Sequence, residues 1–156
     1  MRFSKFQVVT ICLLIAIAVQ GASASQCKTF FAVQHDRLIT EGCTSPVGFC
    51  AGGTFTGNHG FRGNFSFIAL SFVDLGNGIR QAVPGISVYE TEEGTLKISD
   101  VSVLDNDRLT FAGVGHIIEG TGRFAGATGD VFTTGRVSAD RLSFTTDMTA
   151  QICFPN

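Results

Sequence analysis

The sequence contains no tryptophan, a single tyrosine and only three prolines in 156 residues, and 15% of its residues are charged. It has no cluster of lysine and arginine interleaved with aromatic side chains, the pattern that predicts binding to nucleic acid or to an anionic membrane. It also lacks a Cys-x-x-Cys pair, histidines at ligand spacing and a loop with EF-hand spacing. We therefore expect no nucleic acid, no membrane, no metal and no cofactor among its partners.

A long apolar run without a charge occurs once, at the N-terminus. Residues 8–19 are almost entirely apolar, follow Arg2 and Lys5, and precede Ala22-Ser23-Ala24. About a dozen apolar residues are too few to cross a bilayer, but they suit the core of a cleavable export signal. We predict a signal peptide over residues 1–24 and a single secreted domain over residues 25–156, with an extracellular or periplasmic location.

The cysteine count supports export. Of the five cysteines, Cys12 falls within the predicted signal, which leaves Cys27, Cys43, Cys50 and Cys153. An even number of cysteines in an exported chain predicts two disulfides, and four cysteines can pair in three ways. We favour Cys27–Cys153, which would join the two ends of the domain, together with Cys43–Cys50, which would close a short loop.

The chain is rich in residues typical of strands and turns, with 19 glycines and 15 phenylalanines. Alternation with a period of two is clearest over residues 142–152, and no window shows a sustained helical period. Eight strands are predicted, over residues 29–40, 49–57, 61–74, 84–91, 94–104, 108–119, 130–137 and 141–153. Eight antiparallel strands most simply close into an up-and-down barrel in an all-β domain, and a two-sheet β-sandwich is the alternative.

Three of these strands carry patterns that need a local explanation. Residues 61–74 have apolar side chains on both faces, which favours cover on both sides, either by a partner protein or by a second copy of the chain in a homo-oligomer. The apolar parity changes between Ile98 and Val101, which predicts a β-bulge at Ser99–Asp100. His116 shares its face with apolar side chains, so we expect it in the core.

The phenylalanines would give the barrel a mainly apolar interior. Such an interior either holds a small hydrophobic molecule or is filled by the protein's own side chains. The leading hypothesis is a secreted, disulfide-stapled β-barrel that acts as a binding or structural module. A third hypothesis, an extracellular protein-interaction module, would use the outer surface of the sheet.

The segment Glu119–Gly129, with the sequence EGTGRFAGATG, is the most distinctive in the chain. No Lys-Ser/Thr pair follows its glycines and no helix is predicted after it, so it is not a phosphate-binding loop. Its glycines allow positive φ angles, and its phenylalanine can pack the loop against one end of a barrel. The loop residues given this conformational role are Gly120, Gly122, Phe124, Gly126 and Gly129.

This segment resembles the GGTGxFxxAxG segment of allene oxide cyclase and dirigent-protein barrels, and the CTSPVGFC segment at Cys43–Cys50 is similar to one in small secreted members of that superfamily. The resemblance implies an eight-stranded barrel. Dirigent proteins carry a His-Asp pair on the first strand, with the aspartate proposed to assist quinone-methide chemistry, and the resemblance assigns that position to His35-Asp36. The second hypothesis is therefore a cofactor-free enzyme or chirality-directing protein of this type.

Carboxylates on or beside predicted strands are the further catalytic candidates. An inward carboxylate in an apolar barrel would have a raised pKa and could act as a general acid or base. Glu90, Asp100 and Glu119 lie in such places, although a solvated surface position is the default for each. Glu119 adjoins the distinctive loop, so Asp36 and Glu119 are the two predicted catalytic residues.

Overall fold

The computed structural model describes residues 26–156, so the predicted signal peptide lies outside the described residues. These residues form nine strands and one short 3-10 helix. They are β1 (Gln26–Ile39), β2 (Cys50–Gly57), β3 (Arg62–Ala69), β4 (Phe72–Gly76), β5 (Ile79–Thr91), β6 (Gly94–Asp105), β7 (Thr110–Gly120), η1 (Gly122–Phe124), β8 (Thr128–Val137) and β9 (Ser143–Phe154).

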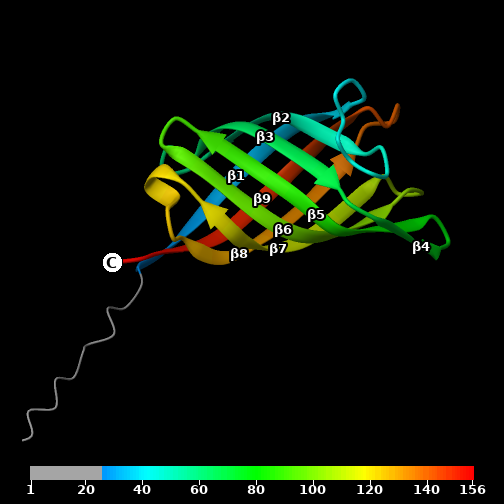
Figure 1. The fold of residues 1–156 in the computed structure, drawn as a ribbon. Coiled ribbons are helices and arrows are strands. Elements are labelled where there is room, and N and C mark those ends of the chain that lie inside the picture. The colour runs from blue at the N-terminus through cyan, green and yellow to red at the C-terminus, as the bar shows by residue number, and fades with distance from the viewer. Residues whose placement is uncertain (1–25) are drawn as a thin grey trace, which may run out of the picture.

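Eight of the strands close into an antiparallel barrel, and β4 is an additional strand (Figure 1). Each barrel strand pairs with the next one along the chain, and β9 pairs with β1 to close the ring. The predicted up-and-down barrel is confirmed, and the sandwich alternative is wrong. Closure satisfies the edges that an open sheet would expose.

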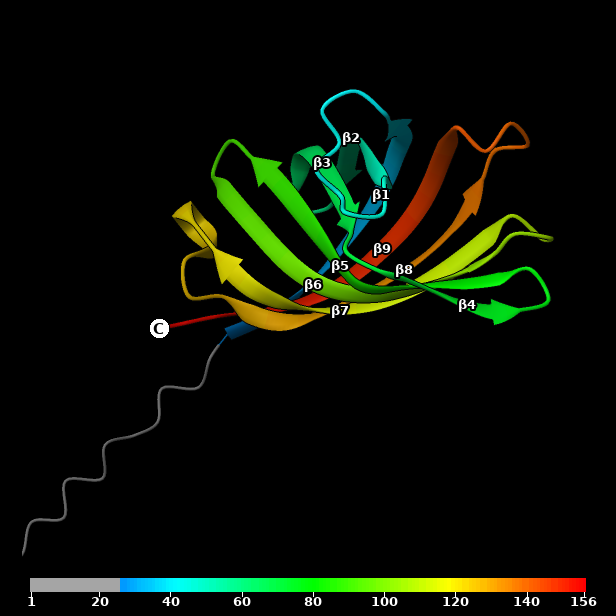
Figure 2. The ribbon, with the colours of Figure 1, turned by 45° about the vertical axis from the view of Figure 1, so that its right-hand side comes forward.

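The predicted strand over residues 61–74 is divided in two. It breaks after Ala69, and both parts pair with β5: Ala69 lies opposite Gly85, and Phe72 lies opposite Ala82. The break changes the parity, because Phe67 before it and Phe72 after it both line the interior. Apolar residues on both apparent faces therefore have an explanation within one chain. Figure 2 shows β4 and the start of β5 extending past the end of β3.

The bulge predicted at Ser99–Asp100 is wrong. β6 keeps its alternation through this point, so that Asp100 and Ser102 line the interior while Val103 on the other face is exposed. The register shifts lie in the neighbouring strands instead, between Ala82 and Gly85 of β5 and in β7 opposite the Lys97–Ile98 step. The apolar residues change from one face of β6 to the other because the inward positions become polar at Asp100 and Ser102. The side chains themselves keep their directions.

The prediction of a core histidine on β7 is also wrong. His116 is exposed, and the inward residues of this strand include Gly115 and Ile117. Val114 shares the outer face with His116 and is 50% exposed. The apolar character of that face therefore lies on the outside of the barrel.

The outer surface carries three exposed apolar residues in one row across neighbouring strands, with a threonine between the two phenylalanines. Val114 of β7 pairs with Phe132 of β8, Phe132 pairs with Thr149 of β9, and Thr149 pairs with Phe31 of β1. Phe31 and Phe132 are 54% and 55% exposed. Exposed apolar groups in one row are typical of contact surfaces, and the homo-oligomer stays a prediction.

One end of the barrel is filled by its own side chains. Phe61 and Phe124 are fully buried there, and Phe61 contacts the rings of Phe30, Phe55 and Phe124 at centroid distances of 5.4, 4.6 and 6.0 Å. The start of β1, the C-terminus and the β7–β8 connection lie at this end in Figure 1. We refer to it as the closed end.

The distinctive glycine-rich segment forms part of the closed end. Gly122, Gly126 and Gly129 have positive φ angles, and Phe124 and Ala127 belong to the hydrophobic core. Glycine is needed at such φ values because a Cβ atom would be strained there. The segment therefore has the conformational role predicted for it. Gly120 differs from the others: its φ is not positive, but an added Cβ would collide with the backbone of the 3-10 helix.

Two disulfides reinforce the barrel, and both follow the favoured pairing. Cys27–Cys153 joins β1 to β9 at positions that face each other in the sheet, across a sequence separation of 126. Cys43–Cys50 closes a loop with a sequence separation of 7. Two disulfides fit an oxidising compartment. None of the helices in residues 26–156 is long and apolar enough to cross a membrane.

Candidate ligand-binding site

The other end of the barrel contains a cavity of about 110 Å³. All nine strands contribute to its walls together with Phe49 of the β1–β2 loop, and we refer to the end of the barrel where this loop lies as the mouth. One half of the interior is therefore packed with the protein's own side chains and the other half is hollow, and a bound small molecule stays a prediction. Six phenylalanines line the cavity: Phe49, Phe65, Phe67, Phe72, Phe111 and Phe144.

Phe49 stands between opposite walls at the mouth. Its ring contacts Phe67 of β3 and Phe72 of β4 on one side, at centroid distances of 6.0 and 5.6 Å. On the other side it contacts Phe144 of β9 at 6.0 Å. These are edge-to-face contacts, the arrangement that aromatic pairs favour. Phe49 therefore narrows the entrance.

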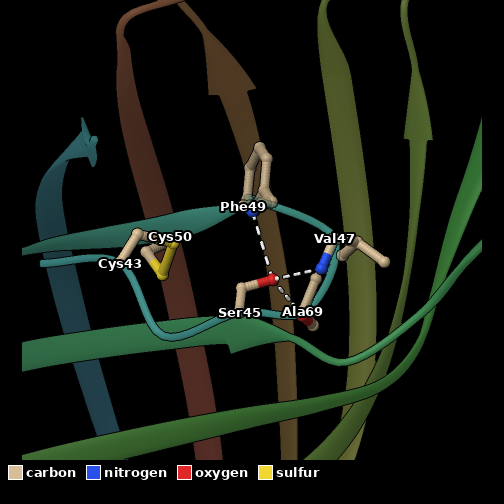
Figure 3. Close-up of a disulfide and its surroundings, with 6 residues drawn as sticks. All are labelled: Cys43, Ser45, Val47, Phe49, Cys50 and Ala69. Carbon is tan, nitrogen blue, oxygen red and sulfur yellow. Dashed lines mark hydrogen bonds between the residues drawn. A yellow bond between two sulfur atoms is a disulfide. The ribbon is translucent and has the colours of Figure 1, made fainter. Parts of the chain in front are cut away.

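The Cys43–Cys50 loop fixes the position of Phe49 (Figure 3). Ser45 Oγ accepts hydrogen bonds from the backbone N–H groups of Val47 and Phe49, at 3.2 and 3.1 Å, and donates one to the carbonyl of Ala69 at 2.5 Å. The disulfide and this serine tie the loop to itself and to the end of β3. The entrance is thus held by covalent and hydrogen bonds.

A buried polar pair forms the boundary between the hollow and the packed halves. Gln34 Nε2 donates a 2.6 Å hydrogen bond to the hydroxyl of Tyr89, and both side chains are almost fully buried. Tyr89 also contacts Phe55 and Phe65 of the core at 5.2 and 5.0 Å. Burial, together with the negative charges of Asp36 and Asp100, raises the pKa of Tyr89, so it remains a neutral phenol.

Asp36 of β1 points into the cavity. Only 6% of the residue is exposed, and no protein group among the described residues donates a hydrogen bond to its Oδ1. Burial raises the pKa of the Asp36 carboxyl from 3.8 to about 7. Its neighbour His35 is exposed on the outer face, because successive side chains of a strand point to opposite sides. His35 and Asp36 are adjacent in the sequence, but their side chains lie on opposite sides of the barrel wall.

Asp100 of β6 is the second carboxylate in the cavity. Ser87 Oγ donates a 2.6 Å hydrogen bond to its Oδ2, while its Oδ1 has no donor within residues 26–156. Burial raises the pKa of Asp100, and the bond from Ser87 opposes this shift. Gly85 and Gly115 make room for the side chain, since a Cβ atom at either position would collide with it.

The remaining sequence candidates lie outside the cavity. The Glu119 side chain is 62% exposed and forms an ion pair with Lys97 at 3.7 Å. Glu90 is exposed on β5. The structure therefore brings Asp36 together with Asp100 and does not bring it together with Glu119.

Sequence reasoning missed the polar pair and placed Asp100 on the surface by default. One signal for Gln34 was present, because Phe30, Ala32, Gln34 and Asp36 alternate on one face of β1 and all four are buried. Tyr89 is the only tyrosine of the chain and ends an inward series on β5. Polar residues in an inward series indicate a lined cavity where a filled core would have apolar ones.

Comparison of the chain with protein-family models, with curated proteins and with solved structures found no match. The function is therefore inferred from the chemistry of the cavity.

Proposed function

We propose that this protein is a secreted binding module that holds a small, mainly hydrophobic molecule in the hollow half of its disulfide-stabilised barrel. The observation that carries the proposal is the aromatic cavity at the mouth, separated from a fully packed closed end. Ligand sites are concave and mostly apolar, with a few placed polar groups, and the mouth of a β-barrel is a common position for them.

The size of the cavity limits the ligand. An enclosed apolar cavity of about 150 Å³ holds benzene, and the cavity here measures about 110 Å³. A single ring or a short branched chain is therefore the largest group that we expect inside, with the remainder of the molecule passing Phe49 at the entrance. A long acyl chain would need the packed half of the barrel, where Phe61 and Phe124 are fully buried.

Toluene is the probe for this proposal, because it is one ring without a polar group. We expect toluene to shift the NMR signals of Ala82 and Thr133, which line the cavity. Replacement of Ala82 by leucine fills part of the cavity and should weaken toluene binding by roughly tenfold or more, as lost contacts of ~1.4 kcal/mol would do.

The matched control is Ala112→Leu, which adds the same atoms at an exposed position on β7. It should bind toluene like the wild type. If toluene and its polar analogues all leave the cavity signals unchanged, the proposed function is wrong. Equal weakening by the inner and outer leucines would also contradict it, because binding would then occur elsewhere.

A second candidate is supported by the position of Asp36. A carboxyl with a pKa of about 7 inside an apolar cavity can donate or accept a proton near neutral pH. This is the chemistry required by the cofactor-free enzyme or chirality-directing protein that the sequence resembles. Such a protein would steer a reactive intermediate by the shape of the cavity, with Asp36 as its acid or base.

Turnover by variants tests this second candidate. Asp36→Asn should reduce turnover of a supplied allene oxide or quinone methide by roughly 10²-fold or more, the usual contribution of a positioned acid or base. Glu119→Gln should leave turnover unchanged, because Glu119 lies on the outer surface. Full activity of Asp36→Asn would rule out this role for Asp36.

A further inference from the structure

We propose that the ligand of this cavity is a compact aromatic or alkyl amine, whose protonated nitrogen is bound by Asp36 and surrounded by phenylalanine rings. The inference rests on the proposed function and specifies the chemical class of the ligand. Its basis is an imbalance inside the cavity: one oxygen of each of two buried carboxylates has no hydrogen-bond donor among residues 26–156, and the cationic side chain in the lining, Arg80, is exposed and lies against Phe72.

The acceptors are the carboxylates on opposite walls. Asp36 Oδ1 and Asp100 Oδ1 are both buried, and no described protein group donates a hydrogen bond to either atom. Native proteins rarely leave a buried polar atom unpartnered, because its desolvation is then uncompensated. A ligand with several N–H donors would satisfy these oxygens.

A protein cation does not serve this purpose within the described part of the chain. The charged or titratable side chains that line the cavity with Asp36 are Tyr89, Asp100 and Arg80. Arg80 is exposed at the mouth, where its guanidinium lies 5.3 Å from the centre of the Phe72 ring. The strands on either side of Asp36, β2 and β9, present only uncharged side chains to the cavity.

The ion pairs of the described residues lie elsewhere. They are Lys97–Glu119, Arg108–Asp105 and Arg123–Glu93. Neither cavity carboxylate therefore forms an ion pair with a cation of residues 26–156. A metal ion is a poor match for them, because no group of three or more potential metal-binding side chains occurs in residues 26–156.

The aromatic lining favours an organic cation. Phe67, Phe72, Phe111 and Phe144 surround the hollow that the carboxylates enter. The face of an aromatic ring attracts a cation, and the attraction is strongest where water is excluded. The same rings would hold the apolar part of the ligand. A carboxylate ligand would meet the opposite situation, since two acids and the negative faces of the rings would repel it.

Three ligands of similar size separate the possibilities. Benzylamine, benzyl alcohol and toluene share one ring and differ in the polar group. At about pH 8 we expect benzylamine to bind roughly tenfold more tightly than benzyl alcohol or toluene, the value of one charge-assisted hydrogen bond. Titration calorimetry measures all three affinities.

Two further readouts test the role of Asp36. Asp36→Asn should weaken the binding of benzylamine roughly tenfold and leave the binding of toluene unchanged, whereas Asp147→Asn on the outer face of β9 should change neither affinity.

The benzylamine affinity of the wild type should also fall as the pH is lowered below about 7, because Asp36 then becomes protonated while the amine stays charged. Asp100→Asn provides a second inner variant with the same direction of effect.

The outcomes are distinguishable. If toluene binds and benzylamine binds no more tightly, the amine inference is wrong while the proposed function stands. The same conclusion follows if Asp36→Asn and Asp100→Asn both bind benzylamine like the wild type. If none of the three compounds binds the wild-type protein, both proposals fail.

Discussion

Replacement of both Cys27 and Cys153 by serine is expected to lower the free energy of unfolding by roughly 4–5 kcal/mol, the chain-entropy estimate for closing a loop of more than a hundred residues. The bond spans a sequence separation of 126 and joins the first strand to the last. Without it, β1 and β9 are joined only by non-covalent contacts, which are the hydrogen bonds of the ladder and side-chain packing such as that of Phe30 against Phe154. Urea unfolding of the mature protein measures the effect.

The control is the corresponding double-serine variant of Cys43 and Cys50. That disulfide closes a loop with a sequence separation of only 7, so the same estimate gives roughly 2–3 kcal/mol. We expect its main consequence at the mouth, where the loop holds Phe49. Equal destabilisation by the two variants would contradict the view that loop length decides the contribution of each bond.

Asp36→Asn is expected to stabilise the ligand-free protein at about pH 8 by ~2 kcal/mol. The pKa of Asp36 is raised from 3.8 to about 7 in the folded state, so its ionised form is favoured in the unfolded chain. A shift of this size corresponds to ~4 kcal/mol at about 1.4 kcal/mol per pKa unit, and water reaching the cavity reduces it. Urea unfolding across the pH range measures the difference between the variant and the wild type.

The sign of the pH dependence follows from proton uptake. Between about pH 4 and 7 the folded protein binds a proton at Asp36 that the unfolded chain does not bind, so the wild type gains stability as the pH falls. The advantage of Asp36→Asn should therefore shrink towards pH 4 and level off above about 7. Asp147→Asn, at an exposed position, should show no such profile. A constant difference at every pH would disprove the burial of this charge.

Much of the fold was predictable because the alternation of apolar and polar residues reports burial directly. On β9 the predicted inward series from Phe144 to Ile152 is confirmed, whereas Leu142, the first residue of that series, precedes the strand and is 56% exposed. The barrel followed from such patterns, and the two disulfides followed from the number and positions of the cysteines. Where the strands enclose a packed interior, the apolar residues are the ones whose side chains point inward, so the sequence pattern identifies the inner face.

In the hollow half of the barrel, apolar residues do not mark the inward positions. On β6 the inward positions are occupied by Asp100 and Ser102 and the outward one by Val103, so a pattern based on apolar residues implied a bulge that does not exist. On β7 the inward Gly115 leaves room for Asp100, while the outer face carries the apolar side chains next to His116. Which face of a strand is inside depends on the closed ring, and local sequence does not contain that information.

Asp36 illustrates what could be known beforehand. Its strand and its alternation with Phe30 and Ala32 were visible in the sequence, so an inward position was predictable. Its distance in sequence from Asp100 and Tyr89 is large, and only barrel closure brings β1 and β5–β6 to the same cavity. The acidic character of the site therefore arises from tertiary structure.

The division of the barrel into a packed end and a hollow end has a consequence for how this protein can evolve. Phe61 and Phe124 secure the fold at one end, whereas Phe67, Ala82 and Ser102 line the hollow at the other. Stability and ligand choice thus depend on largely different residues of the same strands. Mutations near the mouth can change which molecules the protein binds while the closed end preserves the fold. Barrels that descend from one sequence can therefore differ in ligand specificity and share the same scaffold.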